Sequence, residues 1–261
     1  MGLGKLIVFY DDNEISIDGS VWQWFNEDVA ARFTSYGWQV IPGVDGHDPE
    51  AVSEAVQRAR QDTDRPSLIC CKTQIARGSP NMCGSHKSHG APLGEEEVEA
   101  TRRNLGWEHP PFQIPREVYE AWDARETGSK QQKEWEERLA AYESETPELA
   151  REFKRRMKGE LPGDFRESAE KYLKELVREE RDIATRKASQ AVLERLGPQL
   201  PELIGGSADL SGSNSTLCST SCPVGDSWVE GNYVYYGVRE LGMGAMANGL
   251  AQHGGFIPYC G

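Results

Sequence analysis

Leu6-Ile7-Val8-Phe9-Tyr10-Asp11-Asp12-Asn13-Glu14-Ile15-Ser16-Ile17-Asp18-Gly19 is the stretch that decides how this chain is interpreted. The run Leu6–Tyr10 has the length and the side chains of a buried strand. It ends in carboxylate and amide groups, and the ends of parallel strands are where α/β proteins hold ligands. These oxygen donors suit a hard cation that carries a phosphorylated ligand, although they also form turns with their own backbone. Because the run starts so close to Met1, we expect any such cation site to be incomplete in this chain.

The composition excludes several classes of partner. The chain has 261 residues, of which 38% are hydrophobic, and a formal net charge of -13. Nucleic acids and anionic membranes would therefore be repelled at long range. No run approaches the roughly 20 apolar residues of a membrane span, and no signal peptide precedes the first strand. We expect a cytoplasmic protein with no nucleic-acid partner and no membrane partner.

The six cysteines favour free thiols in a reducing compartment. Cys70 and Cys71 are neighbours in a predicted strand, and we interpret them as small core residues. Cys218 and Cys222 lie in a loop rich in Ser and Thr without a nearby histidine, which is weak evidence for zinc.

Hydrophobic periodicity predicts a first α/β segment. After the opening strand come a helix over residues 22–33, a strand over 38–41, a helix that starts at Asp48-Pro49, and a strand over 66–72. This alternation implies right-handed crossovers and a parallel sheet that is covered on both faces. Residues 73–93 carry little periodicity, and we expect a functional loop there.

A connector and a second α/β segment follow. From Glu95 to about Glu180 the sequence is helical and highly charged, which indicates a connector with a solvated outer face. Thr185 is the expected N-cap of the next helix, which Gly197 ends, and strands are expected over 203–204, 234–236 and 256–259. The predicted fold is α/β with doubly wound parallel sheets, in which two partial domains, residues 1–150 and 151–261, are joined by the helical connector.

The block Gly84–Gly94 contains His86 and His89 between glycines. Glycines let the backbone approach a ligand closely, and an imidazole can donate to a phosphate oxygen and exchange protons near neutral pH. A metal pair and two solvated loop histidines remain alternatives.

Arg186 falls in the first turn of a predicted helix, where free N–H groups attract anions and a guanidinium matches a phosphate. Ser213 can add a hydroxyl donor from the loop after Asp209. An ordinary surface arginine is the alternative interpretation.

Glu240 follows a predicted strand, among small and apolar neighbours. We expect its carboxyl group to be poorly hydrated and to share a proton with a ligand nitrogen. Pairing with Arg239 or capping the next helix is the alternative.

Taken together and in this order, these blocks resemble the transketolase family, thiamine-diphosphate enzymes of the pentose phosphate pathway. The matching blocks are Phe9–Gly19, Ser85–Leu93, Arg186–Ser189, Gly206–Leu210 and Tyr236–Met243. The resemblance covers essentially the whole chain. It implies that residues 1–150 are the C-terminal part of the pyrophosphate-binding domain with the connector, and that 151–261 are the N-terminal part of the pyrimidine-binding domain.

The resemblance implies a cofactor site in the first part. The Asn13 side chain and the Ile15 carbonyl would form half of a Mg²⁺ site, where Ca²⁺ or Mn²⁺ would also fit, and that metal would hold the diphosphate of thiamine diphosphate. The other half comes, in the family, from an upstream Gly-Asp-Gly aspartate. His89 would touch both the diphosphate and the substrate, and Ile75 would pack near the thiazolium ring.

The resemblance also implies roles in the second part. Asp209 and Leu210 would contact the cofactor and the donor substrate, and Arg186 and Ser213 would grip the sugar phosphate. Glu240 would hydrogen-bond the aminopyrimidine ring and, with His89, is the expected catalytic residue. In the family this glutamate serves the cofactor held by the other subunit, so a homodimer with active sites at its interface is implied.

The implied activity is the reversible transfer of a two-carbon ketol unit from a ketose phosphate to an aldose phosphate. The pair Ala76-Arg77 departs from the family, which commonly has a glycine and an aromatic residue there. We expect the chain to be an incomplete portion of the enzyme and, in isolation, to have no turnover. The alternatives are dihydroxyacetone synthase, deoxyxylulose phosphate synthase and a non-catalytic cofactor-binding fragment.

Overall fold

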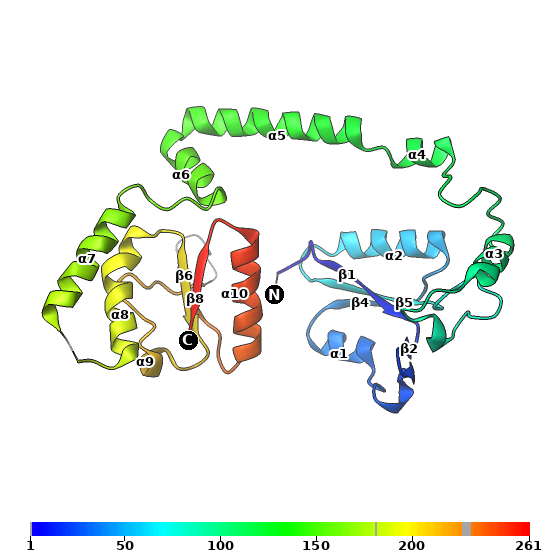
Figure 1. Ribbon diagram of the computed structural model, residues 1–261, viewed down its shortest axis with the longest axis horizontal. Helices are drawn as coiled ribbons and strands as arrows, with labels where there is room; N and C mark the ends of the chain where they lie inside the picture. The colour runs from blue at the N-terminus through cyan, green and yellow to red at the C-terminus, as the bar shows by residue number, and fades with distance from the viewer. Residues whose placement is uncertain (1, 181, 226–230) are drawn as a thin grey trace. The chain divides into compact units, whose positions relative to one another are not determined.

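The computed structural model describes residues 2–180, 182–225 and 231–261. The chain separates into two compact units, Met1–Trp122 and Asp123–Gly261. Each unit contains a three-stranded parallel sheet (Figure 1).

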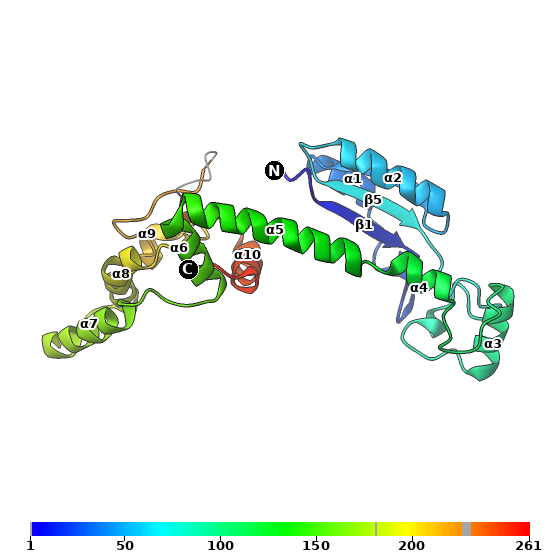
Figure 2. The same cartoon turned by 90° about the horizontal axis from the view of Figure 1, so that it is seen from above.

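The first unit is built on the strand order β1-β5-β4. Its strands are β1 (Ile7–Asp12), β4 (Gln39–Asp45) and β5 (Ser67–Lys72). Figure 2 shows β1 and β5 side by side, and Figure 1 shows α1 (Val29–Ser35) and α2 (Pro49–Gln61) on opposite faces of the sheet. The doubly wound α/β fold is therefore confirmed.

The core of this unit lies between the sheet and α2. Ile69 and Ala59 are fully buried, and Ile41 is nearly so. Cys70 and Cys71 are also buried, which confirms that they are core residues. Burial of this apolar surface is the main force that holds α2 against the sheet.

Local signals place the first helices only in part. Asp48 caps α2 as expected, since its Oδ1 accepts hydrogen bonds from the backbone N–H groups of Glu50 and Ala51. The predicted helix over 22–33 is wrong in its first half, because α1 begins only at Val29, where the Asp28 carboxylate caps it. The preceding residues form the short strands β2 (Ile15–Ser16) and β3 (Gly19–Ser20) and the 3₁₀ turn η1 (Val21–Gln23).

The loop after β5 contains the 3₁₀ turn η2 (His86–Ser88) and leads into α3 (Glu95–Asn104) and α4 (Arg116–Trp122). Residues 73–93 have no other helix or strand, as the sequence predicts.

The second unit begins with the helices α5 (Arg125–Glu145) and α6 (Pro147–Met157), which meet at a bend (Figure 1). No residue of α5 is buried, which confirms a solvated connector. The remaining elements are α7 (Phe165–Glu179), α8 (Thr185–Leu196), η3 (Gly197–Gln199), β6 (Leu203–Ser207), α9 (Ser211–Asn214), β7 (Tyr233–Tyr235), α10 (Glu240–His253) and β8 (Ile257–Cys260).

The second sheet has the order β7-β6-β8. Figure 1 shows α8 and α10 on either side of it. The expected N-cap of α8 is wrong by one residue, because Ala184 occupies that position and Thr185 is already helical.

Arg155 on α6 ties the connector to the start of β6. Its Nη1 and Nη2 lie 2.8 and 2.9 Å from the two carboxylate oxygens of Glu202, whose side chain is only 4% exposed. Nη2 also lies 2.6 Å from Glu152. The hydrogen bond from Arg155 lowers the pKa of Glu152 to about 2. Burial alone would raise the pKa of Glu202, but the bond from Arg155 helps to bring it below the ordinary value.

These two carboxylates should make the second unit sensitive to acid. A folded-state pKa below the ordinary value of 4.5 means that the stabilisation is present above that pH and is lost as the pH falls toward the folded pKa. Arg155→Met should lower the free energy of unfolding at neutral pH by about 3 kcal/mol, because it leaves a buried carboxylate unpaired, and should flatten the acid dependence. Urea unfolding between pH 7 and pH 3 measures this free energy as a function of pH. Arg138→Met, on the exposed α5, is the control. The same pH dependence of the unfolding free energy in the two variants would contradict the prediction.

Candidate functional site

Two predicted site residues follow β1: Asn13 lies in the turn, and Ile15 is the first residue of β2. Asn13 accepts a hydrogen bond from the backbone N–H of Ile15 through Oδ1, at 2.9 Å. The Asn13 side chain therefore does form a turn with its own backbone, which is the alternative interpretation of this stretch. This turn does not use up the amide oxygen, which has two lone pairs, so Oδ1 can accept this bond and still offer a ligand to a cation.

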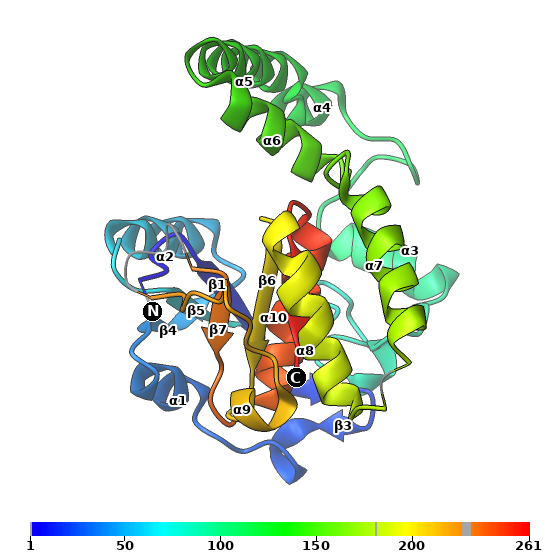
Figure 3. The same ribbon diagram turned by 90° about the vertical axis from the view of Figure 1, so that its left-hand side faces the viewer.

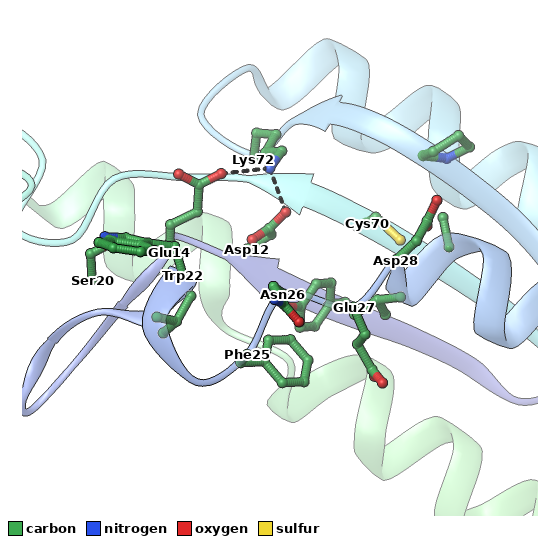
Figure 4. Close-up of a pocket in the computed structure, with 15 residues that line it drawn as sticks. Asp12, Glu14, Ser20, Trp22, Phe25, Asn26, Glu27, Asp28, Cys70 and Lys72 are labelled. Atoms are coloured by element: carbon green, nitrogen blue, oxygen red, sulfur yellow. Dashed lines mark hydrogen bonds and ion pairs between the residues drawn. The ribbon is translucent and has the colours of Figure 1, made fainter.

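Lys72, at the end of β5, sits opposite Asp12 in the register of the sheet. Its Nζ lies 2.6 Å from Asp12 Oδ2 and 3.1 Å from Glu14 Oε1 (Figure 4). Hydrogen bonds to Asp12 and then Glu14 raise the pKa of Lys72. The carboxylates on either side of Asn13 thus have a cationic partner within the protein. Sequence reasoning missed Lys72, although its place at the end of a predicted parallel strand was a usable signal.

A cavity of about 430 Å³ opens beside Asp12 and Lys72. Figure 4 shows Trp22, Phe25 and Asn26 from the segment after β3 along its wall. Asn13 and the loop after β5 do not line it. The predicted ligand residues therefore belong to the strand ends rather than to this hollow.

Ile75 and His89 lie in the loop that follows β5. The Ile75 carbonyl accepts a hydrogen bond from the Gly84 N–H at 2.9 Å. The His89 N–H donates to the His86 carbonyl at 3.0 Å, and the His89 side chain is exposed. His47, which the sequence analysis did not single out, accepts from the Gln74 N–H through Nε2 at 2.7 Å. The base of the loop is therefore attached to the segment after β4.

Within the described ranges 2–180, 182–225 and 231–261, no group of three or more His, Cys, Asp or Glu side chains is placed to hold a metal ion. A metal at the β1 turn would need ligands such as the Asn13 amide and backbone carbonyls.

The other predicted residues gather at the carboxyl edge of the second sheet. Asp209 and Leu210 follow β6, and Glu240 begins α10 after β7. Figures 1 and 3 show α9, which contains Ser213, at this edge, and Figure 1 shows the start of α8, which contains Arg186, there too.

Local contacts fix this second edge. Asp209 has a φ of 65°, an uncommon left-handed conformation that often marks a functional turn. The Leu210 N–H donates to Ser207 Oγ at 3.2 Å. Tyr233 OH contacts Thr216 Oγ1 at 2.7 Å and donates to Ser211 Oγ at 2.8 Å, which ties β7 to α9.

The expected poor hydration of Glu240 is wrong for this chain. The side chain is exposed in the first turn of α10, and the adjacent Leu241 is 90% exposed. Its small neighbours in the sequence do not cover it, because the helix buries Met243 instead. Arg239 donates to the Tyr236 carbonyl at 3.0 Å. The Glu240 side chain is thus open to solvent in the described structure.

Two parallel sheets with polar loops at their carboxyl edges define an α/β protein of the ligand-binding class. Residues 1–162 match the model of the transketolase thiamine diphosphate binding domain. Residues 181–261 match the model of the transketolase pyrimidine binding domain. The chain belongs to the transketolase family, as the sequence blocks predict.

Curated relatives agree with this assignment. The chain is 56% identical over 259 residues to Transketolase 2 of Escherichia coli, a match that covers 99% of this chain and 39% of the relative. It is 54% identical over 257 residues to Transketolase 1 of the same organism, with 98% and 39% covered. The chain thus spans about two fifths of the length of these relatives.

Solved structures confirm the fold. Transketolase from Pichia stipitis in complex with sedoheptulose-7-phosphate superposes with a TM-score of 0.85 at 36% identity, over 98% of this chain and 39% of that one. Transketolase from Leishmania mexicana gives 0.85 at 35% identity, over 99% and 38%. Separately, none of the helices in the described residues has the length and hydropathy needed to span a membrane.

Gly206 on β6 leaves room for the Tyr236 ring and the Val234 carbonyl group. A Cβ there would lie 2.2 Å from Tyr236 Cε2 and 2.5 Å from the Val234 carbonyl oxygen, whereas a Cβ at Gly212 in α9 would meet nothing within 4 Å. Gly206→Ala should lower the free energy of unfolding by about 2 kcal/mol, and Gly212→Ala should leave it unchanged or raise it by about 0.5 kcal/mol. Urea denaturation of both variants checks this, and equal midpoints would refute the role given to Gly206.

Proposed function

We propose that this chain is the cofactor-binding portion of a transketolase, which transfers a two-carbon ketol unit from a ketose phosphate to an aldose phosphate. The observation that supports the proposal is that both family domains match in sequence, and that Asn13, Asp209 and Glu240 follow the carboxyl ends of strands in the two sheets. Thiamine diphosphate, when bound, supplies the electron sink for the carbon–carbon bond cleavage.

The turn after β1 is the proposed metal and diphosphate side. Asn13 Oδ1 and the Ile15 carbonyl offer the hard oxygen ligands that Mg²⁺, Ca²⁺ or Mn²⁺ accepts. The Asn13–Ile15 hydrogen bond supports this, because it holds the amide oxygen in one orientation. His89 would donate to the diphosphate, and Ile75 would cover the thiazolium ring.

The carboxyl edge of the second sheet is the proposed pyrimidine and sugar side. Glu240 would bond the aminopyrimidine ring, with Asp209 and Leu210 beside it. The exposure of Glu240 supports a cofactor held by a second copy of the chain, and hence a homodimer. Arg186 and Ser213 would bind the phosphate of the sugar, because a first-turn arginine and free helix N–H groups favour anions.

The partners follow from the same assignment. The Pichia stipitis enzyme is seen in complex with sedoheptulose-7-phosphate and, in a mutant, with xylulose-5-phosphate, and we propose sugar phosphates for this chain too. We further propose residues 1–150 as the pyrophosphate side with its connector, residues 151–261 as the pyrimidine side, and a cytoplasmic location.

A chimaera tests the cofactor site. The chain replaces the matching segment of Escherichia coli Transketolase 2, and calorimetry measures thiamine diphosphate binding with Mg²⁺ present. Asn13→Ala should raise the Kd at least about tenfold, because it removes an oxygen ligand of the metal that anchors the diphosphate. Asn26→Ala, an exposed asparagine in the same unit, is the control. A chimaera that neither binds the cofactor nor transfers ketol units would overturn the proposed function.

The same chimaera tests whether Arg186 binds the phosphate group of the sugar. Arg186→Ala should raise KM for phosphorylated sugars by about tenfold to a hundredfold and leave kcat within about twofold, because a contact to a non-reacting phosphate contributes to binding. Arg60→Ala on α2 serves as the matched exposed control. An unchanged KM in the Arg186 variant would exclude that role.

A further inference from the structure

The loop that contains Ile75 and His89 has neither a strand nor an α-helix to hold its backbone. Residues 73–94 form turns and one short 3₁₀ segment between β5 and α3. Fixing each residue of such a loop costs about 1–2 kcal/mol of conformational entropy. Contacts from a neighbouring element therefore add to the hydrogen bonds within the loop in favouring one conformation.

Glu97, in α3, supplies three of these contacts. Its Oε1 accepts hydrogen bonds from the Asn81 N–H at 2.9 Å and from the Ser79 hydroxyl group, and its Oε2 accepts from Asn81 Nδ2 at 2.8 Å. Ser79 is only 2% exposed. Hydrogen bonds from Ser79 and Asn81 lower the pKa of Glu97, so the side chain is a carboxylate that can accept on both oxygens at neutral pH.

A second attachment lies at the other end of α3. Asn104 Nδ2 donates to the Gly78 carbonyl at 2.9 Å. Gly78 has a φ of 89°, and a Cβ there would lie 2.5 Å from Leu105 Cδ2. The turn over residues 78–82 is thus fastened to α3 at two points.

The fastened turn is connected to His89 by successive hydrogen bonds. Ser79 Oγ accepts from the Met82 N–H at 3.1 Å, and the Met82 carbonyl accepts from the Ser85 N–H at 3.1 Å. The Ser85 side chain then accepts from the Lys87 N–H at 3.2 Å, just before the bond between His89 and His86.

The Gly84–Ile75 hydrogen bond closes the inner part of the loop. Ile75 forms one side of this hydrogen bond, and the turn over His86–His89 begins just after Gly84 on the other side. The hold of Glu97 on the inner turn therefore restrains both residues that we assign to the cofactor.

We propose that Glu97 is a positioning residue, which touches no ligand itself and presents Ile75 and His89 to the cofactor by clamping residues 79–81 onto α3. The inference deepens the proposed function and rests on it for the roles of Ile75 and His89. The clamp itself can be tested whether or not the cofactor binds.

Amide hydrogen exchange on the purified chain tests the clamp. Glu97→Ala should speed exchange at Gly84, Ser85 and His89 at least about tenfold, because charge-assisted hydrogen bonds are lost. Amides of β5 should exchange at the native rate, which shows that the sheet is intact. Glu99→Ala, also on α3 and paired with Arg103 at the surface, is the matched control. Native exchange rates at the three loop amides in the Glu97 variant would overturn the proposal.

Exchanging the hydrogen-bond donor and acceptor between positions 97 and 81 distinguishes loop positioning from general destabilisation. Glu97→Gln places an amide donor opposite Asn81 Nδ2, and Asn81→Asp in the same chain gives that donor an acceptor again. The double variant should recover slow amide exchange. Asn81→Asp alone should not, because it places its carboxylate against that of Glu97. Failure of the double variant to recover would contradict the assigned contacts.

Thiamine diphosphate affinity in the chimaera, measured by calorimetry with Mg²⁺, supplies the functional readout. Glu97→Ala should raise the Kd about tenfold, and the double variant should restore it. Faster loop exchange with an unchanged Kd would refute the positioning role. If the unmodified chimaera takes up no thiamine diphosphate, the proposed function fails, and the exchange data still decide whether Glu97 clamps the loop.

Discussion

The proposed metal and diphosphate site of the first unit depends on the parallel pairing of β1 with β5. This pairing brings the turn after β1 and the loop after β5 to one edge of the sheet, although Asp12 and Lys72 are far apart in the sequence. The ion pairs of Lys72 with Asp12 and Glu14 then join the two segments. Fully buried Ile69 and Ala59 keep this edge in place through the core beneath it. Asn13, Ile15 and Ile75 thus follow strands that must end together.

The second unit also depends on the pairing of two parallel strands, with different side chains holding its sheet edge. Parallel pairing of β6 with β7 puts the turns that contain Asp209 and Glu240 at one edge. Gly206 leaves room for Tyr236 against β6, and the hydroxyl group of Tyr233 fastens α9. Arg155 anchors α6 to the buried Glu202 at the opposite, amino end of β6. The amino end of β6 is thus fixed by an ion pair, while the carboxyl edge of the sheet carries the proposed site residues.

Much of the fold could be predicted from the sequence because its signals are local. Asp48-Pro49 marks the start of α2, and apolar runs mark the strands. The first half of the helix predicted over 22–33 is wrong because the Asp28 carboxylate caps the helix at Val29, although the apolar period begins earlier. The exposure of Glu240 could not be read from its neighbours, since helix orientation decides which side chains are covered. Lys72 and Glu97 were missed because their partners are distant in sequence and meet them only in the folded chain.

We propose that the turn after β1, the loop held by Glu97 and the first turn of α10 serve one thiamine diphosphate across two subunits. A crystal structure of the chimaera with thiamine diphosphate and Mg²⁺ tests this most directly. We expect the metal at Asn13 and Ile15, the diphosphate beside His89, and the aminopyrimidine ring hydrogen-bonded to Glu240 of the other subunit. A cofactor bound elsewhere, or a Glu240 carboxylate distant from the ring in both subunits, would contradict it.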